Sequence, residues 1–479
     1  MICFYGMFLL QASDKPIICE ILDESKQILM NSEEAITQIK TTIRSGLCIS
    51  CGACVFWDTS RKSFMMHSPE GAVPYISSSA QFDLNPMKYC PGRGIDYAGL
   101  YDAYMGGLPQ NHLMGDYKSL YTGYSLDPAI RKNSSSGGII SHVLRYLLEE
   151  SLVDAVICAK QGVKAPHLSA GVVIKNPDDL ASCAQSIYQP TAMLNMLSEL
   201  DAKKRYAITL VPEQCAILRQ MQIDGIPQAQ AIKYVIGPYT GTQLQPQALS
   251  YFYHKLKISD SQALEYIKWR AGDWPGYLEM KSKAKVVVRS LKIYYNFLIP
   301  FYIARSSLTG IDFANEFTDL SVGDAWHPMF EAKGGGHSVV CVRSDKMAQI
   351  IDRMRELGKI HLEEIAWEEA GKMHGHMLDF KKRGAFIRIE YMKLFGKAVP
   401  KYTVKPMHIG VMRYLVEVVN VCLFALAGNP LSRAVLNYIP EPILGASFNF
   451  MRLRWKALSK PTKRKGLADY CLIRVDNEE

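Results

Sequence analysis

Four cysteines form the pattern in this sequence that is best suited to chemistry. Cys48, Cys51 and Cys54 have C-x2-C-x2-C spacing, and Cys90 follows later in a Cys-Pro-Gly sequence. A cluster of four iron and four sulfide ions needs four thiolates, and it often takes three from one tight loop and one from a distant Cys-Pro. The glycine at position 52 lets backbone N–H groups turn towards the sulfurs. We therefore predict that these four cysteines bind one [4Fe-4S] cluster.

Two other interpretations of these cysteines stay open. A structural zinc ion also binds four thiolates, although zinc sites usually pair two C-x2-C knuckles. The four side chains could also be ordinary buried thiols. The other eight cysteines are scattered, and most stand singly in apolar runs such as Val156–Ala159. Those eight are typical of core residues and do not indicate a disulfide scaffold.

A serine and glycine run opens the second stretch that could bind a ligand. The run consists of Ser134, Ser135, Ser136, Gly137 and Gly138. Apolar residues then recur with helical spacing up to residue 150, so the run starts a helix. Hydroxyls, free N–H groups and the positive end of the helix dipole meet there, which suits a phosphate, and Arg131 and Lys132 would add charge. The simpler interpretation is a serine N-cap, and no Gly-Lys-Ser/Thr follows as in a Walker A loop.

The order of predicted elements indicates an α/β fold. Strand-like and helix-like runs alternate from residue 152 to residue 236, with helices expected near residues 178–188 and 192–200. Between residues 317 and 357 the pattern continues with a strand that runs into a turn at Gly323-Asp324, a glycine run, a second strand and a helix. Between residues 278 and 303 the pattern is β-rich and aromatic. Nearer the N-terminus, Ser32 begins a short capped helix, and two strand-like runs around residues 69–71 predict a small hairpin. We predict a lead-in (1–45), a small iron–sulfur segment (46–120), a mixed α/β core domain (121–395) and a basic, partly amphipathic helical extension (396–479).

Length and composition limit the class of protein. The chain has 479 residues, of which 48% are hydrophobic, enough for a sizeable core and too many for a disordered chain. The first ten residues are apolar but lack a basic start and a small-residue cleavage site, so we expect no signal peptide. A thiolate-bound cluster also points to a reducing compartment. We therefore expect a cytoplasmic protein.

Positive charge is concentrated near the C-terminus. Residues 396–465 hold twelve Lys or Arg against Glu417 and Glu441, a formal charge of +10, whereas the whole chain carries +9. Residues 407–426 reach the length of a membrane span, but Arg413 and Glu417 argue for a buried or interfacial helix. With the aromatic and basic residues 448–465, they could associate peripherally with an anionic membrane. The alternative is docking on the protein's own body, and we expect no nucleic acid partner.

These stretches, in this order, resemble the coenzyme F420 hydrogenase/dehydrogenase beta-subunit family, which includes hydroxymethyl-chlorophyll reductase. The similarity runs from about residue 46 to residue 357. It is carried by the cysteine motif, Cys90-Pro91-Gly92, Ser135 to Gly138, Ser186-Ile187-Tyr188, Pro212, Trp274-Pro275-Gly276, Asp319 and Gly323-Asp324-Ala325-Trp326. The resemblance implies FAD beside the cluster, with residues 134–138 at a flavin or substrate phosphate. Tyr188 and Asp324 become candidate cofactor-binding residues.

The sequence departs from the family where a second cluster would bind. The family's cysteines there correspond to Glu213, Tyr239, Ser307 and Gly310, and Cys215 is two residues out of step. Glutamate, tyrosine and serine are poor ligands for such a cluster, and glycine is none. We therefore predict that one cluster is retained and the other is lost.

The resemblance implies an oxidoreductase that passes electrons from a ferredoxin-like donor, through one [4Fe-4S] cluster and FAD, to an organic substrate or carrier. No catalytic acid or base can be named, since His142, Tyr188 and Asp324 are equally typical of ordinary structural positions. The alternative is a degenerate, non-catalytic member that acts as an adaptor in polysaccharide biosynthesis at the inner membrane.

Overall fold

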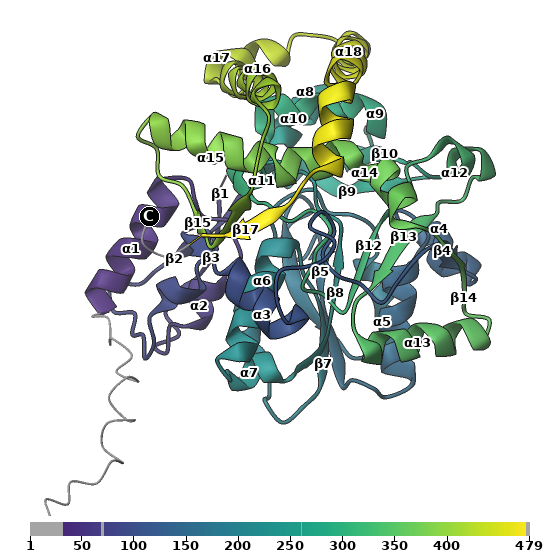
Figure 1. The fold of residues 1–479 in the computed structure, drawn as a ribbon. Helices are drawn as coiled ribbons and strands as arrows, with labels where there is room; N and C mark the ends of the chain where they lie inside the picture. The colour runs from purple at the N-terminus through teal and green to yellow at the C-terminus, as the bar shows by residue number, and fades with distance from the viewer. Residues whose placement is uncertain (1–31, 69–70, 260, 476–479) are drawn as a thin grey trace, which may run out of the picture.

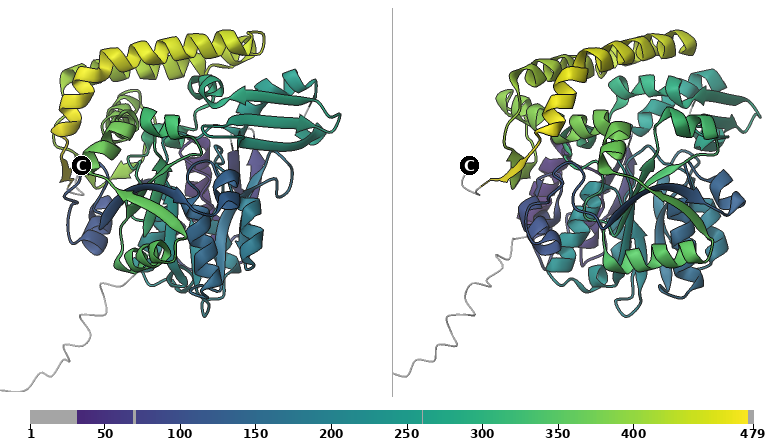
Figure 2. Two further views of the ribbon diagram at one scale, coloured as in Figure 1. Left: turned by 90° about the vertical axis from the view of Figure 1, so that its right-hand side faces the viewer. Right: turned by 45° about the vertical axis from the view of Figure 1, so that its right-hand side comes forward.

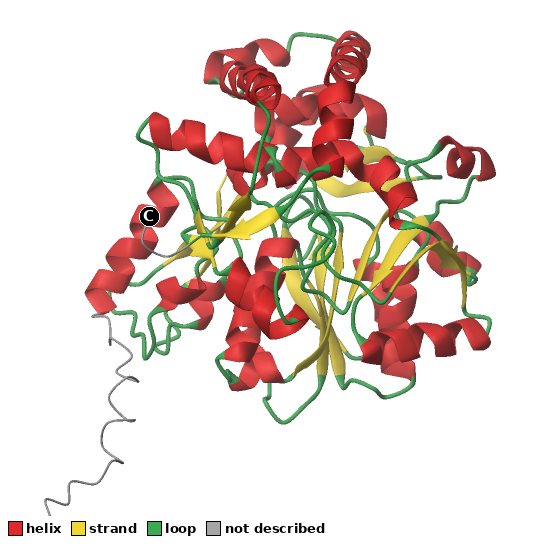
Figure 3. Cartoon of the chain, viewed as in Figure 1, coloured by secondary structure: helices red, strands yellow, loops and turns green. Residues whose placement is uncertain are grey.

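An eight-stranded mixed sheet forms the centre of the molecule (Figures 1 and 3). The structure is a computed structural model that describes residues 32–68, 71–259 and 261–475. In spatial order the strands are β14 (Ile360–Glu364), β4 (Ser119–Ser125), β13 (Ser338–Val342), β12 (Leu320–Asp324), β8 (Ile232–Pro238), β7 (Tyr206–Thr209), β5 (Ala155–Gln161) and β6 (Ser169–Ile174). The four strands from β12 to β5 are parallel to one another, and the remaining pairs are antiparallel. The predicted α/β fold is confirmed.

Helices cover both faces of this sheet because alternate strand residues are apolar on both sides. In β13, Val340 and Val342 pack with α5 (Ile139–Glu149) and α13 (Asp345–Glu356), whereas Val339 and Cys341 belong to the core on the other face. That second core also contains residues of α3 (Tyr97–Met105), α6 (Pro212–Ile223) and α14 (Trp367–Lys382). The short helices α4 (Pro128–Asn133) and α7 (Pro227–Gln230) lie in connections.

The N-terminal segment packs beside the sheet as small elements. It contains α1 (Ser32–Arg44), α2 (Ala53–Phe56), the hairpin of β1 (Phe64–Ser68) and β2 (Gly71–Tyr75), a 3-10 turn (Pro86–Tyr89) and β3 (Gly94–Ile95). The helix predicted from residue 32 and the hairpin are confirmed. The expected lead-in before residue 32 lies outside the described residues. In Figure 1 these elements occupy the left side of the molecule.

Several local predictions were wrong. Residues 177–183 and 194–199 form 3-10 turns where longer helices were expected. Gly323 and Asp324 end β12 and pair with β13, so they form no turn. Residues 293–295 were expected in a β-rich run, but strand β11 (Val287–Leu291) gives way to α9 (Lys292–Tyr295). The helix forms because it places Tyr295 in the core that covers the small sheet of β9 (Leu264–Ala271), β10 (Tyr277–Ser282) and β11.

Further short helices complete this region. They are α8 (Ser250–Leu256), α10 (Ile299–Tyr302), α11 (Arg305–Thr309) and α12 (Pro328–Lys333).

The C-terminal helices form one end of the molecule, at the top of Figures 1 and 2. After α15 (Gly384–Leu394) and β15 (Lys401–Tyr402) come α16 (Val411–Ala427), α17 (Pro430–Leu436) and the long α18 (Glu441–Ala468). Strand β16 (Val404–Pro406) enters this group of helices, and β17 (Leu472–Arg474) pairs with it on the way out. Among the described residues no single helix meets the length and hydropathy needed to cross a membrane; α16 and α17 do so only together, and they are bent by 73°.

Candidate functional site

The four predicted cluster ligands line one small cavity of about 30 Å³. Cys48 and Cys51 lie in the loop after α1, Cys54 is in α2, and Cys90 follows the 3-10 turn at residues 86–89. All four are free thiols. Within the described part of the chain, no three His, Cys, Asp or Glu side chains are close enough to hold a single metal ion. The four thiols therefore line the cavity but are not arranged as ligands of a single ion.

The chemistry of these thiols fits a cationic cluster. Burial raises the pKa of Cys48 to about 11. Burial also raises the pKa of Cys54 well above its ordinary value, and the nearby Cys51 and Cys48 raise it further. Four thiolates in this cavity would repel one another and lack water, so they need a positively charged centre such as iron. An iron–sulfur core supplies that charge.

The backbone around the cluster loop is fitted closely. Gly52 has a φ of +84° at the start of α2, a conformation that favours glycine. A Cβ atom at Gly92 would collide with the carbonyl oxygen of Leu47. The carbonyl oxygen of Cys51 accepts hydrogen bonds from the N–H groups of Met193 (3.2 Å) and Leu194 (2.9 Å). The cluster loop is therefore held against the segment around residue 193.

A second, much larger cavity lies beside that segment. It measures about 1880 Å³, and Met193 is on its wall. Ser134, Ser135, Ser136, Gly138, Tyr188 and Asp324 also line it. Single-ligand pockets usually measure about 300–1,000 Å³, so this cavity has room for a dinucleotide and a second molecule. Six of the seven predicted cofactor-binding residues thus face one space.

The serine hydroxyls at the start of α5 are largely used inside the protein. Ser134 Oγ donates to the carbonyl oxygen of residue 130 (2.7 Å), and Ser136 Oγ donates to that of residue 337 (2.6 Å). Ser135 Oγ accepts from the N–H of residue 186 (2.7 Å) and still has its own proton to donate. The N–H of Gly137 donates to Ser338 Oγ (3.0 Å), so it is not free for a phosphate in this structure.

The first turn of α5 keeps the groups that suit a phosphate. Gly138, with a φ of +81°, is the N-cap, and no side chain caps the helix. The N–H groups of the first turn have no partner within the helix and carry the positive end of its dipole. Ile140 and Ser141 in this turn line the cavity. The predicted phosphate site therefore stands on backbone groups more than on hydroxyls.

The predicted role of Arg131 is not supported. Its guanidinium lies 3.6 Å from the centre of the Tyr124 ring. It donates to the carbonyl oxygens of Gly335 (2.8 Å) and Gly336 (3.0 Å). These two hydrogen bonds from Arg131 hold the glycine run 334–336 in place as an ordered loop.

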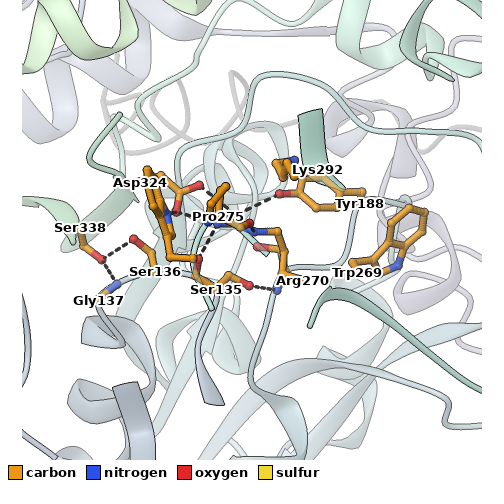
Figure 4. A network of polar contacts seen from close by, with 12 residues as sticks. Ser135, Ser136, Gly137, Tyr188, Trp269, Arg270, Pro275, Lys292, Asp324 and Ser338 are labelled. Atoms are coloured by element: carbon orange, nitrogen blue, oxygen red, sulfur yellow. Dashed lines mark hydrogen bonds and ion pairs between the residues drawn. The ribbon is translucent and has the colours of Figure 1, made fainter. Parts of the chain in front are cut away.

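One buried arginine joins the segments that line the cavity (Figure 4). Arg270, in β9, is 2% exposed. Its guanidinium lies 3.0 Å from Asp324 Oδ2 and 3.3 Å from the hydroxyl of Tyr188. It also donates to the carbonyl oxygens of Ser135 (2.6 Å) and Pro275 (2.6 Å). Arg270 was not predicted from the sequence. The only indication of its role there is that a charged residue stands beside a tryptophan in a strand of buried residues.

Lys292, also missed, completes a polar group around Tyr188. Its Nζ lies 4.0 Å from the centre of the Tyr188 ring. Burial opposes ionisation of Tyr188, but the positive charges of Lys292 and Arg270 outweigh it and lower the pKa of Tyr188 to about 8. Burial likewise opposes ionisation of Asp324, and Arg270 holds the pKa of that carboxyl below its usual range. Tyr188 is therefore able to gain or lose a proton near neutral pH.

We expect the ionisation of Tyr188 to be visible as a tyrosinate absorbance step near pH 8. The step should be absent in Tyr188→Phe. It should move to higher pH in Lys292→Met, because removal of a cation disfavours the phenolate. Since the folded pKa of about 8 lies below the ordinary 10, the ionisation stabilises the folded state fully above pH 10 and is lost as pH falls through 8. Lys283→Met, at an exposed position in the turn between β10 and β11, is the control. An unchanged step in Lys292→Met would contradict this assignment.

Three of the four positions predicted to have lost a second cluster, at residues 213, 307 and 310, lie together. A Cβ atom at Gly310 would collide with the carboxylate of Glu213 and lie 3.2 Å from Lys381 Nζ. Lys381 Nζ in turn donates to the carbonyl oxygen of Ser307 (3.1 Å). Tyr239 packs nearby on other aromatic rings, at residues 313 (5.3 Å) and 374 (5.2 Å). An ammonium and a carboxylate occupy this place, and the buried Cys215 belongs to the core.

Comparisons with known proteins match most of this region. Family models described as coenzyme F420 hydrogenase/dehydrogenase, beta subunit N-term and C terminus, match residues 120–198 and 203–368, together more than half of the chain. The F420-dependent formate dehydrogenase 1 subunit beta of Methanococcus maripaludis is 26% identical over 135 residues, 27% of this chain and 33% of that protein. The chain thus spans about a third of the length of this relative.

A solved structure is also similar, and it comes from the xenon-derivatised F420-reducing [NiFe] hydrogenase complex of Methanosarcina barkeri. The similarity has a TM-score of 0.48 at 18% identity and covers 60% of this chain and 97% of that chain. The two family models begin after the cysteine loop and include Ser134 to Gly138, Tyr188 and Asp324. The chain belongs to the coenzyme F420 hydrogenase/dehydrogenase beta-subunit family.

Proposed function

We propose that the protein is an oxidoreductase subunit that passes electrons from a ferredoxin-like donor to an organic substrate or carrier. One [4Fe-4S] cluster would be bound by Cys48, Cys51, Cys54 and Cys90, and FAD would lie in the large cavity with a phosphate at the first turn of α5. Members of the family carry iron–sulfur clusters and FAD. The four thiols around the small cavity support the cluster site, and the size and lining of the large cavity support the FAD site.

The contact between the cluster loop and the large cavity is the observation that carries this proposal. Met193 donates its N–H to the carbonyl oxygen of Cys51 and also lines the cavity. A single residue therefore separates the thiolate loop from the space proposed for the flavin. When bound, the cluster would supply single electrons, and the flavin would convert between one-electron and two-electron steps.

The chain's own residues would orient the substrate and supply a proton. Tyr188 faces the cavity with its hydroxyl next to two cations, so it can hold or release a proton beside a bound substrate. Asp324 fixes the guanidinium of Arg270, and Arg270 in turn fixes Tyr188. Trp274 and Trp326 line the same cavity, 4.9 Å apart between ring centres, and offer an apolar wall.

The adaptor alternative is less well supported. The family match favours oxidoreduction, and nothing in the comparisons supports a role in polysaccharide biosynthesis.

The deciding experiment is anaerobic purification, addition of FAD and then reduction by reduced ferredoxin, followed by absorbance spectroscopy. Bound flavin that bleaches through the protein supports the oxidoreductase. Protein that retains neither flavin nor iron would instead be an adaptor. The cytoplasmic location stays a prediction. Membrane association is a separate proposal, because it concerns the C-terminal helices and not the lining of the cavity.

We expect Ser141→Asp to weaken FAD binding at least about tenfold. Ser141 is in the first turn of α5 and lines the cavity, so a carboxylate there would repel the phosphate. An acidic residue at a helix start favours the helix, so the fold should be preserved. Ser141→Asn, equal in size but neutral, is the matched control. The measurement is flavin fluorescence during titration of the apo-protein. Equal affinity of the two variants for FAD would show that the phosphate does not bind at the first turn of α5.

A further inference from the structure

Helix α16 is packed with its charges inward and its apolar side outward. Arg413 and Glu417 are 3% and 0% exposed, whereas Val411, Leu415, Val419 and Leu426 are 75%, 55%, 58% and 71% exposed. The two sets alternate with helical spacing, so they form opposite stripes. A helix on the surface of a globular protein normally turns the other way. The outward stripe therefore needs a partner other than water.

Buried ion pairs fix this orientation. Arg413 pairs with Glu417 on the same helix and with Asp379 on α14 (3.1 Å), and Glu417 also pairs with Arg388 on α15. Four charged groups from three helices are thus satisfied beneath α16. Rotation of α16 would turn the apolar stripe towards the protein. It would also leave these buried charges without partners, at a large cost in free energy of folding. The outward apolar stripe is a built feature of the fold.

The neighbouring helices extend the apolar surface. On α17, Leu431 and Tyr438, which follows its last turn, are 74% and 84% exposed. On α18, Phe450 and Met451 are 60% and 51% exposed. Figures 1 and 2 show α16, α17 and α18 lying together across one end of the molecule. We call the outward side of these three helices the apolar platform. Exposed apolar side chains gathered on neighbouring helices in this way mark an interaction site.

The charges around the apolar platform point to an anionic partner. Arg454 is exposed, and its guanidinium lies 5.0 Å from the Phe450 ring. Lys397 is exposed in the loop after α15, whereas the exposed Lys393 of that helix is accompanied by the exposed Glu390. Residues 396–465 contain only two carboxylates. Glu417 is fully buried, and Glu441 pairs with Lys255 (2.6 Å). The platform therefore combines apolar side chains with the exposed Arg454, and its two acids are buried or paired.

We propose that the apolar platform inserts into one leaflet of an anionic lipid bilayer. Interfacial helices bury their apolar side about 5–10 Å deep and use lysine and arginine to contact anionic headgroups. Helices α16 and α17 meet the length and hydropathy of a span only together and are bent by 73°. The Arg413 and Glu417 side of α16 is attached to the protein body. Both facts fit a surface that enters one leaflet and does not cross. This proposal does not depend on the proposed redox function.

Vesicle flotation of the full-length protein tests the proposal. We expect binding to phosphatidylcholine vesicles that contain phosphatidylglycerol, weaker binding to pure phosphatidylcholine, and a decrease with salt. Leu415→Glu with Val419→Glu should reduce the bound fraction at least about tenfold. The matched control is Ile223→Glu with Leu357→Glu, two positions that are 45% and 44% exposed at the C-terminal ends of α6 and α13. Loss in the platform variant alone supports the proposal, and equal binding of both variants overturns it.

Charge variants and a fluorescent label separate the remaining outcomes. Lys397→Glu with Arg454→Glu should abolish the preference for anionic vesicles, whereas Lys203→Glu with Lys204→Glu, at exposed positions elsewhere, should not. Cys422 is exposed on the outward stripe and can carry a polarity-sensitive label without any apolar change, with Cys422→Ser as the blank. A blue shift on addition of vesicles supports insertion. No shift, or a lipid-free dimer that Leu415→Glu dissociates, would assign the platform to another occupant and overturn the proposal.

Discussion

Changing Cys51 to serine will remove nearly all of the iron from anaerobically purified protein. The wild-type chain is expected to be brown and to hold about four iron ions, one [4Fe-4S] cluster. A serine oxygen is a poor ligand for this cluster, and the other three thiols in the cavity cannot retain it alone. Iron analysis and the visible spectrum measure the effect. Cys422→Ser, at an exposed cysteine on α16, should keep the full iron content.

Other metal contents would contradict parts of this prediction. About eight iron ions per chain would mean that a second cluster forms in spite of Lys381, Glu213 and Gly310. One zinc ion and no colour would replace the iron–sulfur assignment by a structural zinc site. A thermal unfolding curve of the apo-protein separates loss of the cluster from loss of the fold.

Changing Glu417 to leucine will destabilise the fold by about 3–5 kcal/mol. Glu417 is fully buried between Arg388 and Arg413, so its removal leaves two buried guanidinium groups with unbalanced charge. Urea unfolding measures the loss. The matched control is Glu356→Leu, which removes an exposed pair with Arg353 and should cost less than about 1 kcal/mol. Equal losses would show that the buried network contributes little.

The same network makes stability depend on pH. Burial favours the neutral form of Glu417, but Arg388 and Arg413 outweigh it and hold the pKa of the carboxyl below its usual 4.5. The stabilisation is therefore full above pH 4.5 and is lost as the pH falls through the lower folded value. Glu417→Leu should lack this part of the acid sensitivity.

The parts of the site that were predicted are those defined within a short stretch of chain. The cysteine spacing and the glycine before α5 need only neighbouring residues, so their geometry follows from local sequence. Arg270 and Lys292 were missed because their significance depends on Tyr188 and Asp324, which are distant in sequence. The serine hydroxyls were overestimated for the same reason.

The C-terminal helices show a similar limit. The sequence predicted an apolar helix with two charges, either buried or interfacial, and the structure contains that helix as α16. Its orientation could not be predicted, because it depends on Asp379 and Arg388 in two other helices. The basic side chains from Lys460 to Lys465, expected at a membrane, lie outside the side chains that the structure describes. The division of the chain at residues 45, 120 and 395 also stays a prediction.

The pairing of β16 with β17 has a practical consequence for engineering. Val404 lies opposite Arg474 and Pro406 opposite Leu472, so the chain leaves the body and returns to it at one place. A segment whose ends are neighbours can be replaced as a cassette, provided that the replacement keeps Arg413 and Glu417 as partners of Asp379 and Arg388. Because Phe448 and Arg452 of α18 also line the large cavity, exchanging this cassette would reshape the cavity wall and its surroundings in a single step.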